Sequence, residues 1–287
     1  MGSRYRIFMY KLWKLKGALI GGLAVGIICV CAIFAPYVAP HDPYLQQVPK
    51  RLIPPVWIEG GTMEYPLGTD LVGRDILSRL IYGSRVSLTV GCLSVILASI
   101  IGVYLGLIAG YYGRLTDTVV STLVNIMLAF PFMLLALAFI AVLGPSFKNI
   151  IIILGITGWP MYTRPIRAEV LSLKQQEFVL AAKAIGMRNN RILFLQILPN
   201  VTNSIIVIAS LEVARMIILE SFLSFLGVGI QPPTPSWGGM LGEGRSFMLM
   251  QWWLAAFPGI AIFIATLGIN LLGEGIRDIF DPRFKDI

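Results

Sequence analysis

Residues 86–110 read VSLTVGCLSVILASIIGVYLGLIAG and contain no charged side chain. A helix needs about 20 predominantly apolar residues to cross the hydrocarbon core of a bilayer, and this run is long enough. The strands of a transmembrane barrel would instead alternate apolar and polar residues over short segments. Because the apolar run is continuous, we predict a transmembrane helix here and an all-α fold.

Five further apolar runs of similar length lie at residues 17–39, 118–143, 149–171, 201–226 and 251–273. The chain is 56% hydrophobic and only 13% charged, with a mean hydropathy of +0.79. Soluble domains carry about 25% charged residues, so this chain lacks the polar side chains that would cover it in water. We predict an all-α integral membrane protein with six transmembrane helices, the fourth of which is interrupted by Pro160 and Pro165.

Basic residues gather in three segments that a six-span topology places on one side of the membrane. These segments are the tail 1–16, the stretch that follows the fourth run, and the tail 274–287. Cytoplasmic loops carry an excess of Lys and Arg, so we expect a cell-membrane protein with both termini in the cytoplasm. Residues 40–85 and 227–250 then form external loops, and residues 86–273 form a core of five helices. The net charge of +8 reflects cytoplasmic loops and not a nucleic-acid-binding stripe.

Glycines recur at four-residue spacing in the second run, at Gly102, Gly106 and Gly110, and in the first run, at Gly17 and Gly21. On a helix, this spacing makes a flat stripe that lets a second helix approach closely. The pattern predicts a packed bundle and carries no information about substrate.

The segment EFVLAAKAIGMRNNRILFLQILPN, residues 177–200, is too polar to cross a membrane. Phe178, Ala181, Ala182 and Ile185 recur at helical spacing, and Gly186 then ends the pattern as a C-cap glycine would. A second short helix is expected to begin near Asn189 or Asn190 and to end before Pro199. The pattern predicts a cytoplasmic helix–turn–helix, either at a protein interface or resting on the bilayer surface.

The same segment resembles the EAA loop of binding-protein-dependent ABC importer permeases. The resemblance rests on Ala181-Ala182, Gly186 and Ile197-Leu198-Pro199, whereas Leu180 and Gln196 depart from the family pattern. In that family the loop is the coupling helix that docks into a groove of the ATPase subunit. The resemblance implies that the ATPase-coupling residues are Glu177, Ala181, Ala182, Gly186, Arg188, Arg191 and Pro199.

Three more stretches, 66–88, 220–241 and 270–283, are similar to the dipeptide, oligopeptide and nickel permease family, and within it to the C-type dipeptide permease. The resemblance implies a type I importer permease bundle that pairs with a second permease, two ATPase subunits and an extracytoplasmic substrate-binding protein. ATP and Mg would be bound by the ATPase subunits, and this chain would bind no cofactor. Di- or oligopeptides are the expected cargo; nickel chelates, glutathione and other small solutes are the alternatives.

The external motif GTDLVGRD combines turn residues with an expected helix start at Asp75. Asp70, Arg74, Asp75 and Arg79 are spaced so that they can pair with one another. The motif is then either a folded cap that orders the external loop or a docking surface for the binding protein. The later stretch GIQPPTPSWGG is too rich in proline for a helix, so we expect an external loop or re-entrant turn with Trp237 at the membrane interface as a second docking candidate.

Three charged residues, Glu212, Arg215 and Glu220, lie inside the fifth run. Charges at that depth are costly and usually face protein or water. They either line the transport path or act as a packing device, with Arg215 paired to Glu212 one turn away and fastening the two permeases together.

Several function classes lack their residues in this sequence. No Gly-Lys pair occurs, so there is no phosphate-binding loop of the GxxxxGK[ST] type for ATP. A single histidine, His41, and cysteines confined to apolar runs indicate neither a catalytic site nor a metal site. An ion-coupled secondary transporter would show two related halves with paired broken helices, and no internal repeat is present. We predict a transport subunit and not an enzyme.

Overall fold

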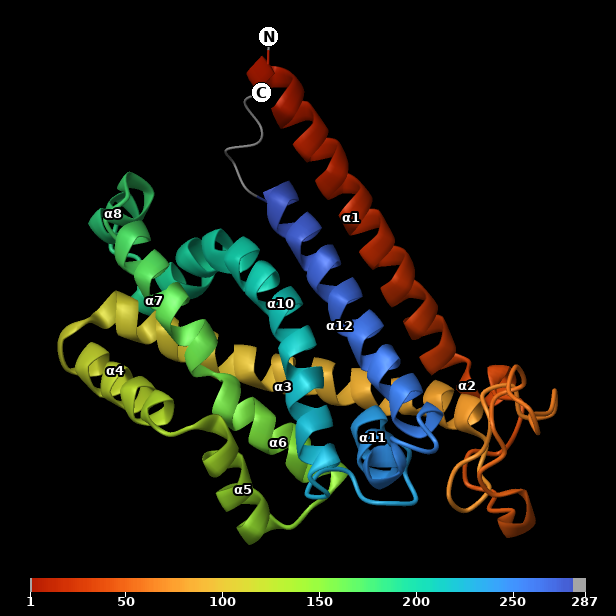
Figure 1. The fold of residues 1–287 in the computed structure, drawn as a ribbon. Helices are drawn as coiled ribbons and strands as arrows, with labels where there is room; N and C mark the ends of the chain where they lie inside the picture. The colour runs from red at the N-terminus through yellow and green to blue at the C-terminus, as the bar shows by residue number, and fades with distance from the viewer. Residues whose placement is uncertain (1, 281–287) are drawn as a thin grey trace.

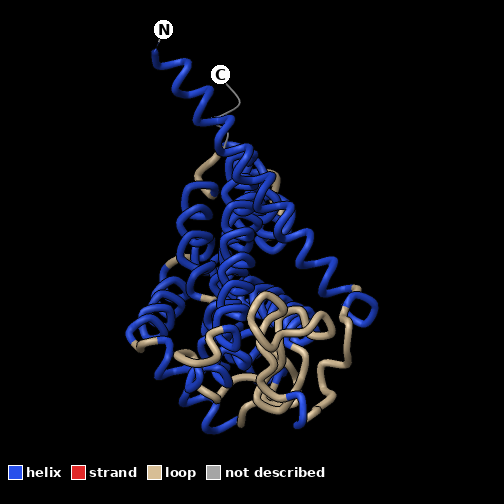
Figure 2. The backbone as a smooth tube through the Cα atoms, turned by 45° about the vertical axis from the view of Figure 1, so that its right-hand side comes forward, coloured by secondary structure: helices blue, strands red, loops and turns tan. Residues whose placement is uncertain are grey.

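The structure of the chain is a computed structural model that describes residues 2–280. Within these residues the fold is helical, with an isolated bridge between Thr69 and Asp75 in place of any strand (Figure 2). The helices are α1 (Gly2–Ile33), α2 (Ala35–Val38), α3 (Ile76–Tyr112), α4 (Arg114–Ala129), α5 (Phe132–Leu143), α6 (Phe147–Gly158), α7 (Pro160–Leu173), α8 (Glu177–Ala184), α9 (Asn189–Arg191), α10 (Leu198–Phe225), α11 (Trp237–Gly244) and α12 (Trp253–Phe280). Short 3-10 turns lie at Val48–Lys50 and Arg245–Phe247, and a π-helical stretch at Ile192–Ile197 joins α9 to α10.

Each of the six predicted spans falls on helix. By length and apolar composition, α1, α3 and α12 are able to cross a membrane, and α4 with α5, bent by 91°, would count as a fourth span. The predicted fourth span is divided between α6 and α7, because Pro160 begins α7 and has no N–H to continue the preceding helix. The count of six spans stays a prediction.

Helix α3 runs through the middle of the molecule and contacts helices from both halves of the chain (Figure 1). Its glycine stripe lies against α7, as the spacing predicts. A Cβ atom at Gly106 would lie 3.0 Å from the Thr163 carbonyl oxygen, and one at Gly110 would lie 2.7 Å from Cβ of Val170. Larger residues at these positions would therefore separate the two helices.

Helices α1 and α12 pack side by side along one flank (Figure 1). A Cβ atom at Gly21 would lie 2.6 Å from the Gly268 carbonyl oxygen, so this predicted stripe also serves close packing. The expected tail 1–16 is not separate, because α1 begins at Gly2. Residues 274–280 of the expected tail 274–287 are the end of α12, and the remainder lies outside the described residues.

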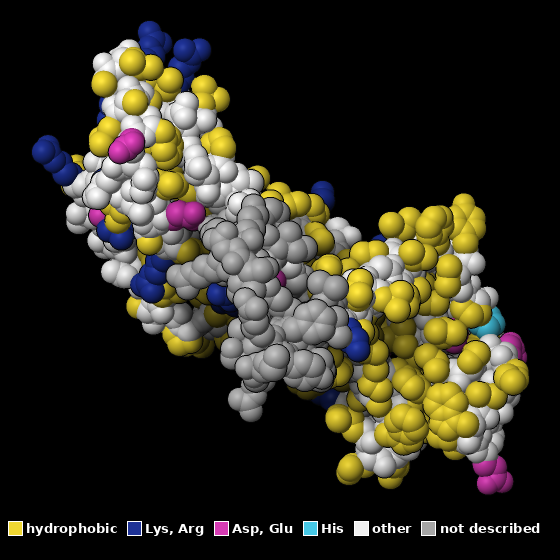
Figure 3. Space-filling model, turned by 90° about the horizontal axis from the view of Figure 1, so that it is seen from above, with side chains coloured by type: hydrophobic (Ala, Val, Ile, Leu, Met, Phe, Trp, Pro, Cys, Tyr) yellow, Lys and Arg dark blue, Asp and Glu magenta, His cyan; other side chains and the backbone are white. Residues whose placement is uncertain are grey.

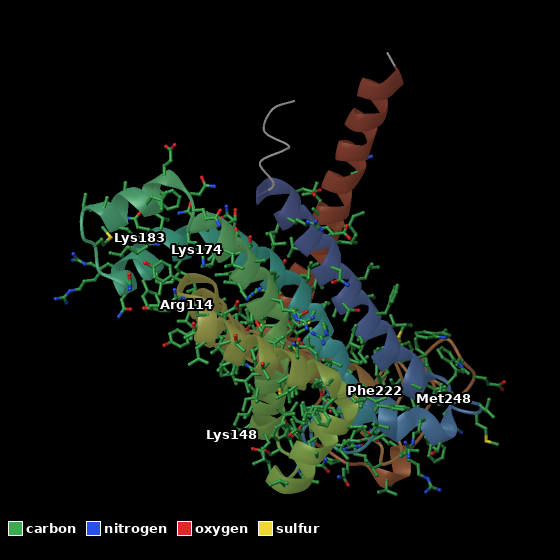
Figure 4. The ribbon with its side chains drawn as sticks, turned by 90° about the vertical axis from the view of Figure 1, so that its left-hand side faces the viewer. Arg114, Lys148, Lys174, Lys183, Phe222 and Met248 are labelled. Atoms are coloured by element: carbon green, nitrogen blue, oxygen red, sulfur yellow. The ribbon has the colours of Figure 1, made fainter. Side chains whose placement is uncertain are left out.

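Two ends of the molecule differ in surface chemistry. Lys and Arg side chains gather over the end that carries α8, whereas the opposite end is mostly hydrophobic (Figure 3). The side-chain view places Arg114, Lys174 and Lys183 together at the α8 end, and Met248 at the other (Figure 4). This polarity agrees with a cytoplasmic location for the α8 end.

Candidate functional site

Helix α8 forms the first half of the predicted helix–turn–helix. Its packed face differs from the expected one: Val179 and Ala182 are buried, whereas Phe178 is 38% exposed and Ile185 is 78% exposed. Val179 and Ala182 belong to a cluster with Leu107 of α3 and Val170 of α7. Most of the apolar stripe read from the sequence therefore points outward, because the helix uses a different side to rest on the bundle.

The turn after α8 is built around Gly186, which has a φ of +77°. The N–H of Gly186 donates to the Lys183 carbonyl at 3.0 Å, and the N–H of Met187 donates to the Ala182 carbonyl at 3.0 Å. These two bonds form a Schellman motif, which closes a helix with a left-handed residue that is usually glycine. The expectation of a C-cap glycine is confirmed.

The second half of the segment departs from the prediction. Helix α9 continues without a break through the π-helical stretch into α10, so no helix end precedes Pro199. Pro199 instead lies two residues after the π-helical stretch, inside this continuous helical run. The second short helix of the expected helix–turn–helix is the beginning of α10 itself.

Tyrosines at the end of α3 hold this second half in place. The Tyr111 hydroxyl donates to Oδ1 of Asn189 at 2.9 Å, and the Tyr112 hydroxyl donates to Oδ1 of Asn190 at 3.3 Å. The Lys183 ammonium lies over the Tyr111 ring, 5.2 Å from its centroid. The two asparagines read from the sequence as N-caps thus serve as tertiary anchors, and Arg188 occupies the cap position.

The outer surface of this segment is exposed and chemically mixed. Ala181 and Ile185 are exposed beside the charged residues Glu177, Arg188 and Arg191. None of these three charged side chains forms an ion pair with another described residue. An apolar strip rimmed by unpaired charges is the composition of a protein interface.

The GTDLVGRD motif, residues 68–75, is organised by a buried ion cluster. Arg79 donates to Asp70 at 2.5 Å and to both carboxylate oxygens of Glu243, at 2.7 and 3.1 Å. Arg74 donates to Asp70 at 2.6 Å and to Glu243 at 3.0 Å. Glu243 comes from α11, so the cluster ties the segment before α3 to the second half of the chain.

Asp75 lies at the start of α3, as the sequence predicts, but its side-chain partners are Ser78 and His41 and not Arg74 or Arg79. Its Oδ2 accepts from the Ser78 N–H at 3.0 Å and from the Ser78 hydroxyl, as an N-cap of α3 does. His41 reaches the same oxygen at 3.4 Å and stacks on Tyr65. Asp70, Arg74 and Asp75 are buried by these contacts, so they order residues 40–85 and present little surface for a partner protein.

Trp237 is likewise inside the fold. It is 2% exposed, begins α11, and donates from Nε1 to the Leu80 carbonyl at 2.9 Å. The side chain packs over Gly83 of α3, where a Cβ atom would lie 2.9 Å from the indole ring. The expected loop 227–250 therefore contains a helix, which starts directly after the prolines because Ser236 caps it.

Glu212 and Arg215 form the predicted pair within α10. Arg215 Nη1 donates to Glu212 Oε2 at 3.0 Å, with Glu212 buried and Arg215 half-exposed. Glu220 is separate and 0% exposed, and it accepts from the hydroxyls of Ser87 and Ser224 at 3.3 and 2.7 Å. The three charges of this span thus divide into a half-exposed pair and a buried carboxyl group bonded to serines.

Sequence reasoning missed Glu243, Val179 and the serines around Glu220. Glu243 is far from its partners in the chain, and a lone glutamate after a glycine-rich stretch gives no local signal. No group of three or more His, Cys, Asp or Glu residues able to hold a metal exists among residues 2–280.

Comparisons with known proteins agree with this architecture. The family described as "Binding-protein-dependent transport system inner membrane component" matches residues 102–286, and the N-terminal TM domain of oligopeptide transport permease C matches residues 3–55. The fold is similar to that of a chain of the inward-facing MetNI methionine ABC transporter. Its TM-score is 0.57 at 18% identity, over 71% of this chain and 97% of that chain.

Curated relatives align along almost the whole length. The dipeptide transport system permease protein DppC of Escherichia coli K12 is 46% identical over 97% of this chain and 93% of its own length. The di/tripeptide transport system permease protein DppC of Pseudomonas aeruginosa is 44% identical over 94% and 89%. The glutathione transport system permease protein GsiD of Pectobacterium atrosepticum is 38% identical over 98% and 92%.

The all-α fold, the match over residues 102–286 and the relatives above 40% identity agree with one another. The chain therefore belongs to the family of binding-protein-dependent transport system inner membrane components, the transmembrane permeases of ABC importers.

Proposed function

We propose that this chain is one of two permeases that form the pathway for di- or oligopeptides in an ABC importer of the cell membrane. The relatives that match almost the full chain are named as dipeptide and di/tripeptide permeases, which supports peptide cargo. A second permease and two ATPase subunits complete the membrane complex, and an extracytoplasmic binding protein delivers the peptide. ATP and Mg are bound, and ATP is hydrolysed, by the ATPase subunits.

The observation that carries the coupling role is the outward apolar strip of α8. Phe178, Ala181 and Ile185 are exposed at the end of the molecule where basic residues gather. A groove on the ATPase that receives this strip would bury it and pair Glu177, Arg188 and Arg191 at its rim. Closure of the ATPase dimer would then push on α10, because α9 runs into α10 without a break.

Reconstitution tests this function. The chain, its second permease and both ATPase subunits are placed in proteoliposomes with the binding protein on the side away from the ATPases. Uptake of a labelled dipeptide should require ATP and the loaded binding protein, whereas the chain purified alone should hydrolyse no ATP. Hydrolysis by the isolated chain, or uptake independent of the ATPases, contradicts the proposal. Inhibition of dipeptide uptake by added glutathione would show that the importer also accepts glutathione, the cargo named for the GsiD relative.

Cysteine labelling tests the orientation. The native Cys29, Cys31 and Cys92 are first removed by substitution. A single cysteine is then introduced at Met63 or at Ala184, both of which are exposed. An impermeant maleimide should label position 63 from outside intact cells and position 184 only after lysis. Labelling of position 184 from outside intact cells would contradict the proposed cytoplasmic location of α8.

A further inference from the structure

Helix α4 has two chemically opposite sides. Leu115, Val119 and Leu123 leave an apolar stripe exposed on one side. Asp117, Ser121 and Asn125 follow one another at four-residue intervals on the other side, which faces α7. A polar stripe within a membrane-embedded segment normally faces protein or a water-filled cavity.

A cavity of about 370 Å³ lies between the polar stripe and α7. Its polar lining consists of Ser121 and Asn125 from α4, with Thr163, Arg164 and Arg167 from α7. The cavity is near the end of the molecule where Arg114, which begins α4, and Lys174, which follows α7, lie close together (Figure 4). It is large enough for a ligand the size of a dipeptide.

The charges in this cavity do not balance. Arg167 is engaged with Asp117 through both Nε and Nη2, and the Nη2 contact is 2.6 Å. Arg164 donates from Nη2 to Oδ1 of Asn125 at 2.9 Å and forms no ion pair within residues 2–280. Asn125 is neutral, so the exposed Arg164 side chain has no carboxylate partner among the described residues.

Arg164 retains the donors for an anionic ligand. A guanidinium has five N–H donors, and one is used by Asn125. Two parallel N–H groups match the geometry of a carboxylate, which forms a bidentate pair with arginine. The cavity lies on the side of α4 opposite the exposed apolar stripe, so a polar solute fits it better than a lipid tail does.

We propose that Arg164 is a subsite for the α-carboxylate of the peptide cargo, in the cavity between α4 and α7. The inference rests on the proposed peptide-permease function and adds a specificity-determining residue to it. Every unmodified linear peptide carries this carboxylate whatever its side chains, so one arginine suits a permease that accepts many sequences. The headgroup of a phospholipid with a net negative charge and a carboxylate of the second permease are the competing anions, and the test separates them.

The test compares a free dipeptide with its C-terminal amide in the reconstituted importer. Arg164→Gln should lower uptake of the free dipeptide about tenfold, since a hydrogen bond to a charged group is worth about that factor or more, and should change uptake of the amide much less. The selectivity of the binding protein cancels when each variant is divided by wild type for the same cargo. Lys148→Gln, which removes an exposed positive charge outside the cavity, is the matched control.

A second variant tests the role of the Arg164 charge while leaving Arg164 itself intact. Asn125→Asp would supply an internal carboxylate to Arg164 and should reduce uptake of the free dipeptide well below that of Asn125→Ala. This arm needs no amidated cargo. If Asn125→Asp transports at least as well as Asn125→Ala, the subsite is excluded.

Three other outcomes overturn the proposal and name the cause. Equal loss of both cargoes in Arg164→Gln assigns a structural role. Loss of the second permease on purification assigns Arg164 to the subunit interface. A deficit that appears only in vesicles containing phosphatidylglycerol, and not in phosphatidylcholine vesicles, assigns a lipid headgroup. Wild-type uptake of dipeptide in the same experiment keeps the proposed function separate from the fate of the subsite.

Discussion

The external ion cluster and the α8 segment use charged residues in opposite ways. At the external end, Asp70, Arg74 and Arg79 are buried and share Glu243 across the fold. At the α8 end, Arg188 and Arg191 are exposed and form no ion pair with another described residue. The first region resembles the inside of a folded domain, and the second resembles half of an interface.

The difference separates residues that hold the chain together from residues that are left for a partner. A buried charge needs its opposite within the same chain, because removal of one partner leaves the other uncompensated. An exposed charge beside apolar surface can be paired later. In the sequence, the charged motifs at both ends are candidates for docking a partner. Only the burial of their side chains separates the structural motif from the docking candidate.

Arg79→Ala should disrupt the buried ion cluster and have the largest effect on stability of the variants considered. It would deprive Glu243 and Asp70 of their shared guanidinium and should destabilise the external end by about 3–5 kcal/mol. The measurement is the thermal unfolding of the detergent-purified permease pair. Arg85→Ala, an exposed arginine further along α3, is the control and should unfold like wild type. Equal unfolding temperatures for the two variants would mean that the cluster is not structural.

Gly186→Val should disturb the exposed side by a local effect. No atom lies within 4 Å of a Cβ placed at Gly186, so the variant introduces backbone strain without a clash. Strain of about 1–3 kcal/mol should distort the turn, and the ATPase should co-purify poorly while the second permease stays bound. Gly186→Asn tolerates the same φ and should retain the ATPase. Full retention of the ATPase by the valine variant would remove the coupling role from this segment.

Arg215→Ala tests an intermediate case, because one member of its ion pair is buried and the other is half-exposed. Glu212 is buried and Arg215 is half-exposed, so the variant should cost about 1–2 kcal/mol, less than loss of a fully buried partner. Assembly with the second permease is measured by co-purification, and Glu212→Gln in the same chain should restore part of the loss. A variant that assembles normally yet transports nothing would instead place the pair on the transport path.

Glu64→Gln should have the smallest effect. The Lys50 ammonium donates to Glu64 at 2.6 Å and holds the pKa of this exposed carboxyl below its usual range. A lowered pKa means that the contact stabilises the fold at neutral pH and is lost as the pH falls through that lowered value. Because the pair is exposed, this stabilisation is small, and we expect the unfolding temperature at pH 7 to fall less than in any of the test variants above. A clear drop in the variant would show that this surface pair has a structural role.

Local patterns in the sequence predicted most of the helical architecture. The continuous run 86–110 lies within α3, and the stripe Gly102, Gly106 and Gly110 packs on α7, because both depend on short spacing along one helix. The α8 helix and the Gly186 turn followed from the same kind of pattern. Family motifs added the identity of the bundle.

Other features depend on contacts that no local pattern contains. Glu243 meets Arg79 across 164 positions, and Trp237 finds its acceptor on Leu80 across 157. The buried side of α8 was misjudged because a short helix with apolar residues on several sides can rest on more than one of them. The packing of α3 and α7 decides in favour of Val179 and Ala182.

Because α9 is continuous with α10, a movement of α9 would be transmitted along the whole length of α10. A helix of the length of Leu198–Phe225 extends about 42 Å, so a tilt of about 10° at its α8 end displaces the far end by about 7 Å. The π-helical stretch Ile192–Ile197 is a widened turn at the base of this rod, which makes it the natural place for the rod to bend. A small movement beside Gly186 would therefore become a larger displacement near the buried carboxyl group of Glu220.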